Sequence, residues 1–321
     1  MTISRRRFIT VTAGLALAGT IGSSNAKAVS WRGIALGAQA KLVITGLPES
    51  EARRLIALAK TEIDRLENIF SLYRKDSAIA NLNRNGRLAA PPFELLELLS
   101  AVDAVNKATS GKFDPTVQPL WQAYGENGGV LKPEVLSKTM EMIGWQHVRI
   151  DNQAIQFAKP DMAMTLNGIA QGFVTDRIAS LLKSEGLENA VINVGEIAAL
   201  GHKSGAEPWQ IGIADHGDER NPQAFVPLSN QAIATSAPDG TTFKNNSSHI
   251  ISPVTGLPIT SQWQRVSIIH KSAAIADGLS TAMVMMNEEE MQKAAQQIGE
   301  TKVIAKHNAK HNDGATIYYQ S

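Results

Sequence analysis

The sequence predicts an α+β fold in which mixed sheets pack against helices in a single compact catalytic unit. Apolar residues recur at helical spacing in several long stretches, whereas other stretches are the short alternating or continuous apolar runs that are typical of strands. The two kinds of segment follow one another without strict alternation, which favours α+β over a doubly wound sheet. No linker, repeat or low-complexity segment divides the 321 residues, and a chain of this length can bury a large core.

The segments up to residue 157 predict three helices, a strand and a hairpin. The first helix carries an apolar stripe formed by Leu55, Ile56, Ala59, Ile63, Leu66 and Phe70. We expect a strand at Ile34–Thr45, a helix at Glu51–Phe70 capped by Ser50, a polar segment at Ser71–Asn85, a helix at Phe93–Thr109 opened by Pro91 and Pro92, a loop at Phe113–Trp121 pinned by Pro115 and Pro119, a helix at Pro133–Met142, and a hairpin of Val148–Ile150 and Ala154–Phe157 around Asp151 and Asn152.

The segments after residue 157 mix strands and helices again. We expect a strand at Met162–Leu166, a helix at Ala170–Lys183, strands at Ala190–Val194, Gln210–Ala214 and Ala232–Ser236, a loop at Ser247–Gly256, a strand at Arg265–His270, helices at Ala273–Met286 and Glu288–Ile298, and closing strands at Lys302–Lys306 and Thr316–Tyr319. This order of elements completes the α+β prediction.

Composition and charge exclude several classes of protein. Hydrophobic residues make up 43% of the chain and charged residues 19%, which is typical of a globular protein. Residues 1–28 hold four of the 31 basic side chains and none of the 30 acidic ones, so the remainder has a net charge of about −3 and lacks the basic excess of a nucleic-acid-binding domain. Cysteine is absent, which excludes disulfides, thiol catalysis and cysteine-ligated metals.

The N-terminus predicts export by the twin-arginine route. Ser4–Thr10 reads SRRRFIT, and the apolar run Val11–Ile21 that follows is too short to span a bilayer as a permanent helix. Small residues then lead to an A-x-A pattern at Ala26–Ala28, which is typical of a cleavage site. We expect residues 1–28 to be a signal peptide and residues 29–321 to form the periplasmic domain. A basic amphipathic N-terminus is the alternative.

The stretch Thr165–Phe173 joins a predicted strand to a predicted helix. Such a junction offers free backbone N–H groups and the positive end of the helix dipole, which suit an anion such as a phosphate. Gly168 and Gly172 would let a ligand approach the backbone closely. An ordinary strand–helix turn is the alternative for this stretch.

Asp277 and Thr281 lie four residues apart on a predicted helix and therefore on one face of it. A carboxylate and a hydroxyl are oxygen ligands that suit Mg²⁺, which completes its coordination with water and substrate phosphates. The backbone carbonyl of Gly168 could supply a third ligand. A polar patch near a helix start is the alternative.

Histidines give weaker signals. His249, in a loop between serines and an apolar pair, could act as a general base or donate a hydrogen bond to a phosphate, although a lone loop histidine is often only exposed. His307 and His311 are four apart, but Lys306, Lys310 and Asp313 crowd that segment and favour a solvated stretch over a metal site. The chain has no Walker lysine loop, no G-x-S-x-G elbow and no H-E-x-x-H motif.

Segments spread over nearly the whole mature chain resemble the motifs of the ApbE family of FAD:protein FMN transferases. They are Phe70–Ser77 with Leu82 and Asn83, Gly111–Leu120 (G-x-F-D-x-T-x-x-P-L), Leu166–Phe173 with Asp176 (D-L-G-G-I-A-K-G-Y-x-x-D), Asn193–Glu196 (N-x-G-G-[DE]), Ala234–Ser236 (A-T-S), His249–Gly256 (H-I-x-D-P-x-T-G) and Ala276–Ala282 (A-D-x-L-[SA]-T-A). The resemblance implies an ApbE-like, T-fold-related arrangement of mixed sheets with packed helices.

The chain departs from these motifs at several positions. The family's acid, one glycine and lysine around the third motif are Thr165, Asn167 and Gln171 here, and its aspartate and arginine in the histidine segment are Ser252 and Val254. Together with the twin-arginine signal, the variants LNGIAQGF at Leu166–Phe173 and GEI at Gly195–Ile197 look like the NosX branch, whose members are accessory to nitrous-oxide reductase in denitrification and are thought to flavinylate the membrane-bound regulator NosR.

The resemblance implies that FAD is the donor, that a Thr or Ser of a partner protein is the acceptor, and that AMP is released. It implies Mg²⁺ held by Gly168, Asp277 and Thr281, and His249 and Asp277 as catalytic residues. The residues implied to bind the flavin nucleotide are Tyr73, Asn83, Phe113, Asp114, Thr165, Gln171, Ser236 and Ile251. A periplasmic flavin carrier without transferase activity is the alternative, while the lack of a dinucleotide fingerprint disfavours an oxidoreductase.

Overall fold

The computed structural model describes residues 29–44, 47–203, 206–215, 221–308 and 316–321. The predicted signal peptide and cleavage site, Thr45, Gly46 and the segment with Lys310, His311 and Asp313 lie outside these ranges. None of the helices within them combines the length and apolarity that a membrane span requires.

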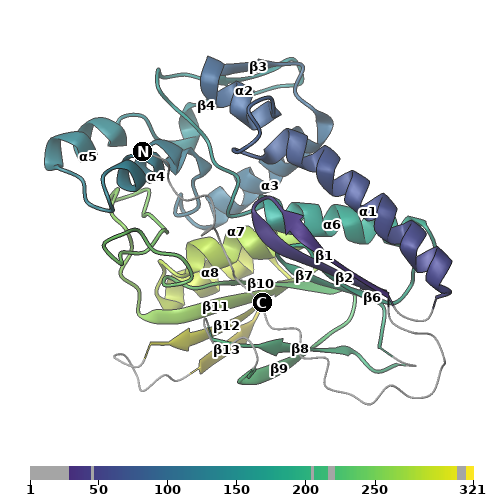
Figure 1. Ribbon diagram of the computed structural model, residues 1–321. Helices are drawn as coiled ribbons and strands as arrows, with labels where there is room; N and C mark the ends of the chain where they lie inside the picture. The colour runs from purple at the N-terminus through teal and green to yellow at the C-terminus, as the bar shows by residue number, and fades with distance from the viewer. Residues whose placement is uncertain (1–28, 45–46, 204–205, 216–220, 309–315) are drawn as a thin grey trace.

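An eight-stranded antiparallel sheet forms the base of the structure (Figure 1). Its spatial order brings strands from both ends of the chain together, because β6 and β7 pair between the N-terminal hairpin and the C-terminal strands. In that order the strands are β1 (Val29–Ala35), β2 (Ala38–Ile44), β6 (Ala190–Asn193), β7 (Ile197–Leu200), β10 (Gln231–Ser236), β11 (Trp263–His270), β12 (Lys302–His307) and β13 (Thr316–Gln320).

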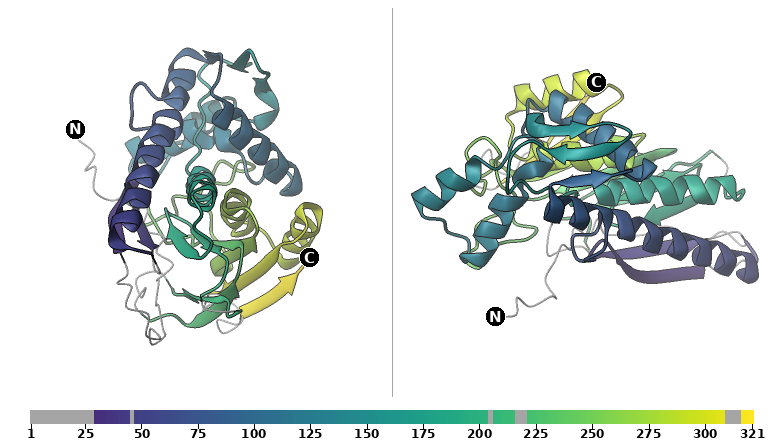
Figure 2. Two further views of the ribbon diagram at one scale, coloured as in Figure 1. Left: turned by 90° about the vertical axis from the view of Figure 1, so that its right-hand side faces the viewer. Right: turned by 90° about the horizontal axis from the view of Figure 1, so that it is seen from above.

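Helices cover one face of this sheet, and a short hairpin covers the other (Figure 2). The helical layer consists of α1 (Glu49–Phe70), α3 (Phe93–Ala108), α6 (Ala170–Ser184), α7 (Ala273–Met283) and α8 (Glu288–Ile298). Its apolar faces and the inner side chains of the sheet form the main core. On the opposite face, β8 (Trp209–Ile213) and β9 (Ala224–Leu228) pack a second, smaller core that includes Trp209 and Leu228. Mixed strands and packed helices confirm the predicted α+β class.

A third group of elements lies beyond the helical layer, at the top and left of Figure 1. It comprises α2 (Ala78–Asn85), β3 (Arg87–Ala89), η1 (Pro115–Val117), α4 (Gln118–Glu126), α5 (Pro133–Met140), η2 (Trp145–His147), β4 (Val148–Ile150) and β5 (Ala154–Phe157). The strands form a three-stranded sheet, and α4 and α5 pack a small core of their own around Tyr124 and Phe243.

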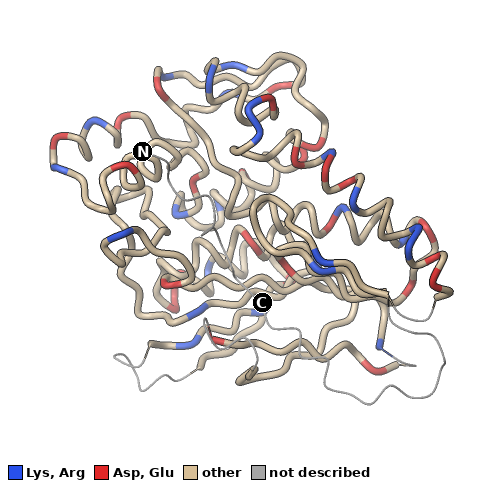
Figure 3. Tube along the Cα trace, in the orientation of Figure 1, with Lys and Arg blue, Asp and Glu red and all other residues tan. Residues whose placement is uncertain are grey.

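Charged side chains of both signs alternate along α1 (Figure 3). Arg53 pairs with Glu49 at 2.6 Å and Arg54 with Glu51 at 2.7 Å, on the face opposite the buried apolar stripe. The polar face of the long helix is therefore solvated, while the predicted stripe from Leu55 to Phe70 is buried in the main core.

Most predicted elements are confirmed, but four details at the N-terminal half are wrong. The strand predicted at Ile34–Thr45 is confirmed as β2 from Ala38 on, but Ile34 and Ala35 belong to β1, because Leu36 and Gly37 adopt positive φ angles of 48° and 85° and reverse the chain. Ser50 does not cap α1, whose N-cap is Pro48. The polar segment Ser71–Asn85 contains α2, which Ser77 caps by accepting a bond from Ala80 N at 3.1 Å. The predicted proline-pinned loop contains η1 and the start of α4, since Pro115 and Pro119 occupy first-turn positions where no backbone N–H is required.

The later segments differ in three respects. Met162–Leu166 is extended but not a strand, because the side chain of Asn83 both donates to Met164 O and accepts from Met164 N at 2.8 Å, in place of a neighbouring strand. The strands β7 and β9 were not predicted. His307, expected in a solvated stretch, is 5% exposed and stacks on Trp263 with ring centroids 4.2 Å apart.

Candidate functional site

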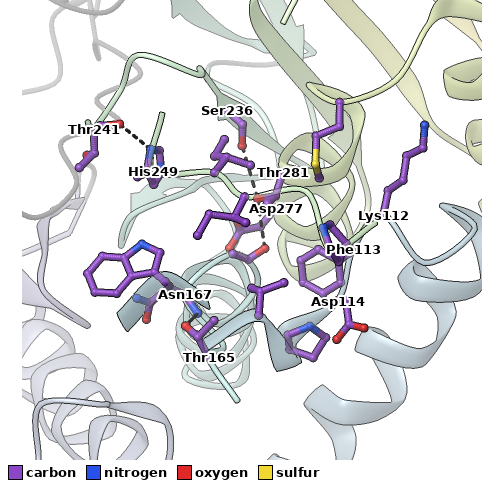
Figure 4. A pocket seen from close by; sticks show the side chains of 18 of the residues that line it. Lys112, Phe113, Asp114, Thr165, Asn167, Ser236, Thr241, His249, Asp277 and Thr281 are labelled. Carbon is purple, nitrogen blue, oxygen red and sulfur yellow. Dashed lines mark hydrogen bonds between the residues drawn. The ribbon is translucent and has the colours of Figure 1, made fainter. Parts of the chain in front are cut away.

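The candidate site is a cavity where loops from the third group of elements meet the helical layer and the end of β10 (Figure 4). Residues 112–117, 165–171, 235–237 and 249–253 form its walls, and one face of α7 closes it. Segments more than one hundred residues apart in sequence therefore converge on one space.

The floor of the cavity is the place where α6 and α7 cross. Gly172 makes the crossing possible, since a Cβ at this position would lie 2.2 Å from Ala273 O and 2.7 Å from Ala274 Cα. The prediction that Gly172 lets a ligand approach is thus wrong, because another helix occupies that space. Gly168, in the turn before α6, does line the cavity as predicted.

Each of these two helices places a carboxylate at the N-terminus of the other. Asp176 of α6 accepts hydrogen bonds from Ser272 Oγ at 2.7 Å and from the backbone N–H groups of Ala273 and Ala274 at 2.7 and 3.0 Å. Asp277 of α7 accepts from Gly172 N, in the first turn of α6, at 3.1 Å. Asp176 thus caps α7 with both carboxylate oxygens. Asp277 accepts only one such bond, so its carboxylate can still accept a hydrogen bond or bind a ligand in the cavity.

The three predicted metal ligands lie together. Thr281 Oγ1 is 3.5 Å from the carbonyl oxygen of Gly168, and Asp277 lines the same cavity one helical turn from Thr281. A Cβ on Gly168 would lie 3.1 Å from Thr281 Oγ1, so a side chain there would crowd the hydroxyl. Ser236 Oγ, a predicted flavin contact, lies 2.8 Å from Ser280 Oγ and 3.5 Å from Thr281 Oγ1. Within the described ranges no group of three or more His, Cys, Asp or Glu side chains could hold a metal ion, and this set contains a single carboxylate.

Burial gives the acids of the cavity unusual proton affinities. It raises the pKa of Asp277 to about 7, an effect that the hydrogen bond from Gly172 opposes. Burial also raises the pKa of Glu196 well above its usual range, and the nearby charge of Asp277 raises it further. A cavity that contains two such carboxylates favours a bound cation or a bound proton.

His249 is oriented by its own loop. Its Nδ1 lies 2.7 Å from the carbonyl oxygen of Thr241, a partner that can only accept, so Nδ1 carries the proton and Nε2 is left as the acceptor (Figure 4). The ring lines the cavity, and burial lowers the pKa of His249 below its usual value. The neutral, proton-accepting form therefore predominates at neutral pH.

The predicted flavin-contacting residues divide into three sets. Phe113, Thr165, Gln171, Ser236 and Ile251 line the cavity.

Asp114 also lines the cavity, but its carboxylate is engaged by Thr116 N and Oγ1 at 2.8 and 2.6 Å and by Trp145 N at 2.9 Å, so it braces the loop. Tyr73 and Asn83 lie outside the cavity lining: Tyr73 is 55% exposed and interacts with Asn167 on the rim, and Asn83 holds the backbone of Met164.

Sequence reasoning missed two charged residues of the cavity. Lys112 lies along its wall, with Nζ 2.9 Å from both carboxylate oxygens of Glu290 (Figure 4). Glu196 lines the cavity from the turn between β6 and β7. The Asn193–Glu196 motif marked that turn, but Glu196 was not among the predicted site residues.

Comparisons with known proteins agree with this geometry. The ApbE family model matches residues 36–305. An FAD:protein FMN transferase of Vibrio cholerae is 32% identical over 249 residues, which cover 72% of this chain and 74% of the relative. A protein of the same name from Escherichia coli K12 is 26% identical over 272 residues, covering 80% and 78% of the two chains.

Solved structures lead to the same family. The flavin transferase ApbE from Vibrio cholerae superposes with a TM-score of 0.79 at 29% identity, covering 92% of this chain and 97% of its own. An ApbE protein from Thermotoga maritima superposes with a TM-score of 0.78 at 26% identity, covering 91% and 96%. The predicted enzyme class, a transferase, is confirmed by these relatives. With a family match that spans most of its length and a cavity assembled from the family's motifs, the chain belongs to the ApbE family.

Proposed function

We propose that this protein transfers FMN from FAD to a threonine or serine hydroxyl of a partner protein and releases AMP. The name of the curated relatives supports the reaction. The observation that carries the proposal is the arrangement of the cavity, where the oxygen donors Gly168 O, Asp277 and Thr281 lie in the same space as the proton-accepting nitrogen of His249.

The site residues fit a divalent cation. Carbonyl, hydroxyl and carboxylate oxygens are the ligands that Mg²⁺ prefers, and Asp277 has an oxygen to spare because a single backbone N–H bonds its carboxylate. Gly168, Asp277 and Thr281 would hold the ion, which supplies charge neutralisation to the pyrophosphate of FAD as AMP departs.

His249 moves the proton in the proposed reaction. The acceptor hydroxyl oxygen forms a bond to the phosphorus of the FMN half, the bond from that phosphorus to the bridging oxygen breaks, and AMP leaves with the bridging oxygen and the electron pair. Nε2 of His249 takes the hydroxyl proton, because Nδ1–H is committed to Thr241 O. The product is FMN joined to the partner by a phosphoester.

We further propose that the partner is NosR and that transfer takes place in the periplasm, during maturation of nitrous-oxide reductase. The support is in the sequence: the twin-arginine pattern at residues 4–10, the variants Asn167 and Gln171 in the glycine-bearing motif, and the Gly-Glu-Ile variant at Gly195–Ile197. Mass spectrometry of NosR from cells with and without this protein tests the proposal, and an FMN increment that persists without it would contradict it.

Incubation of the purified protein with FAD, Mg²⁺ and NosR tests the reaction itself. We expect AMP by chromatography and one flavin fluorescent band that survives denaturation, both in equal amounts. A protein that binds FAD tightly but releases no AMP would be a flavin carrier. The matched control is His249→Gln, which removes the proposed base but leaves the rest of the cavity in place. We expect this variant to bind FAD but not to label NosR with FMN.

A further inference from the structure

Glu196 is a buried acid of the cavity to which the proposed reaction assigns no role. It is 6% exposed and lies in the tight turn between β6 and β7, where Gly195 has a φ of 103°. Its backbone is fixed, since Glu196 O accepts from Thr175 Oγ1 at 3.2 Å and from Val194 N at 3.1 Å. The fold therefore fixes the backbone from which this side chain projects.

No salt bridge to Glu196 is formed among the described residues, and Lys112, which lines the same cavity, is paired with Glu290. The backbone N–H of Thr235 donates to the carboxylate of Glu196, and the charge that acts on it is that of Asp277, which has the same sign. The neighbouring side chain is neutral: Gln171 Oε1 and Cδ lie 2.7 and 2.9 Å from the place where a Cβ on Gly195 would be. The family motif has a lysine at this position of the chain, and a lysine there could neutralise Glu196.

Two buried carboxylates without a counter-ion are costly, whereas a divalent cation between them would relieve the repulsion. We propose that Glu196 is a positioning residue of the cation site, whose buried negative charge beside Asp277 raises the affinity for the ion held by Gly168, Asp277 and Thr281. Because the side chain of Gln171 is neutral, it does not compensate the negative charge of Glu196, which remains available to attract the cation. This inference rests on the proposed function and adds to it the residue that sets cation affinity.

Binding of Mn²⁺, followed by the loss of its free-ion EPR signal in the presence of saturating FAD, measures the effect without any turnover. Glu196→Gln preserves shape and removes charge, and we expect Mn²⁺ to bind about 10-fold to 100-fold more weakly, the range for residues that act on a metal through its ligands. Glu196→Asp keeps the charge and is expected to bind more tightly than the glutamine variant. Glu188→Gln, which alters an exposed glutamate, is the matched control and should bind as the wild type does.

Wild-type affinity in a Glu196→Gln protein with native circular dichroism would overturn the inference. If that variant does not fold, Gln171→Lys decides: its ammonium would compete for Glu196, so a loss of about tenfold is expected and an unchanged affinity overturns the inference. Asp277→Asn separates this result from a failure of the proposed function. If Asp277→Asn loses Mn²⁺ while Glu196→Gln does not, only the role of Glu196 is wrong; if Asp277→Asn binds normally, the cation site itself is wrong.

Discussion

The N-termini of α6 and α7 each donate hydrogen bonds to an aspartate of the other helix, but the two aspartates differ in how many bonds they accept. At α7, Asp176 accepts three hydrogen bonds, so its capacity is committed to the helix start. At α6, Asp277 accepts one bond, from Gly172 N, and faces the cavity beside Thr281. The two aspartates are chemically identical and lie on two helices in contact, and only one of them is left able to bind a ligand.

This difference shows that the number of hydrogen bonds a buried carboxylate accepts from the protein distinguishes a structural acid from a functional one. A carboxylate has about four acceptor positions. When protein donors occupy most of them the residue stabilises a fold, and when one is occupied in a cavity the remaining ones attract a cation or a proton. Burial raises the pKa of both acids, that of Asp277 to about 7, so the hydrogen-bond partners and not the pKa distinguish the two.

The largest expected effect is that of Asp277→Asn on catalysis. The amide oxygen can still accept from Gly172 N, but the negative charge that holds the cation is gone. We expect FMN transfer to fall by about 10³-fold or more, since a bound metal contributes several kcal/mol to such a reaction. The free energy of unfolding should change by less than about 1 kcal/mol. In-gel flavin fluorescence of the acceptor and urea denaturation measure the two quantities; labelling at the wild-type rate would remove Asp277 from the mechanism.

The same substitution at Asp176 should have the opposite profile. Asp176→Asn replaces an acceptor oxygen with an NH₂ group that faces backbone donors of α7, and the charge at the helix start is lost. We expect the free energy of unfolding to fall by about 3 kcal/mol in urea denaturation, with transfer per folded molecule changed far less than in the Asp277 variant. If both asparagine variants gave one profile, the division between the two acids would not hold.

Gly172→Ala tests the contact that brings both acids into place. The added methyl group would lie 2.2 Å from Ala273 O, so the helices must separate. We expect a loss of about 2 kcal/mol in stability, typical of overpacking, accompanied by weaker Mn²⁺ binding because Asp277 moves with α7. Gly186→Ala is a control for destabilisation without a steric clash: its Cβ would have no neighbour within 4 Å, and its φ of 85° strains an alanine, whereas Gly172 has no positive φ. Weakened Mn²⁺ binding in the control as well would show that general destabilisation, not the crossing, is responsible.

The smallest expected effect is the pH dependence of FMN transfer, which tests the proposed base of the cavity, His249. Neutral His249 is the active form, and it is lost only as pH falls through its pKa, which burial lowers. A histidine with the ordinary pKa of about 6.5 would be half protonated at about pH 6.5. A base with a pKa of about 6.5 would lose roughly tenfold of its neutral form between about pH 7.5 and 5.5. With saturating Mg²⁺ to keep Asp277 ionised, we expect the transfer rate to fall by clearly less than that over the same interval, because burial lowers the pKa of His249. A fall that begins above pH 7 would show that His249 is not the base or that its environment is polar.

Sequence patterns predicted what depends on local periodicity. The apolar stripe of α1 and the exact bounds of α8 follow from spacing, and the hairpin at Asp151 follows from turn chemistry. The signals for α2 were also present, since Ser77 and Gly86 flank it as caps, but the polar composition between them concealed a two-turn helix.

Features that depend on distant partners were not predictable from local patterns. The extended segment at Met164 is held by Asn83, 81 residues away, so its composition alone resembled a strand. The convergence of Gly168 with Asp277 and Thr281 came from the resemblance to family motifs, and the structure confirms their proximity. Glu196 was missed because its significance arises from Asp277 and Gln171, which no local spacing connects to it.

The crossing of α6 and α7 also determines when the site can form during synthesis. The bonds that join the two helices link residues 105 and 96 positions apart in sequence. A nascent chain that ends before residue 273 contains α6 but not α7, so Gly172 N lacks the carboxylate of Asp277 and Asp176 lacks the backbone donors Ala273 and Ala274. Because contacts of such long range form late and slowly, the cation-binding donors assemble only after Thr281, near the C-terminal end of the 321 residues, has emerged from the ribosome.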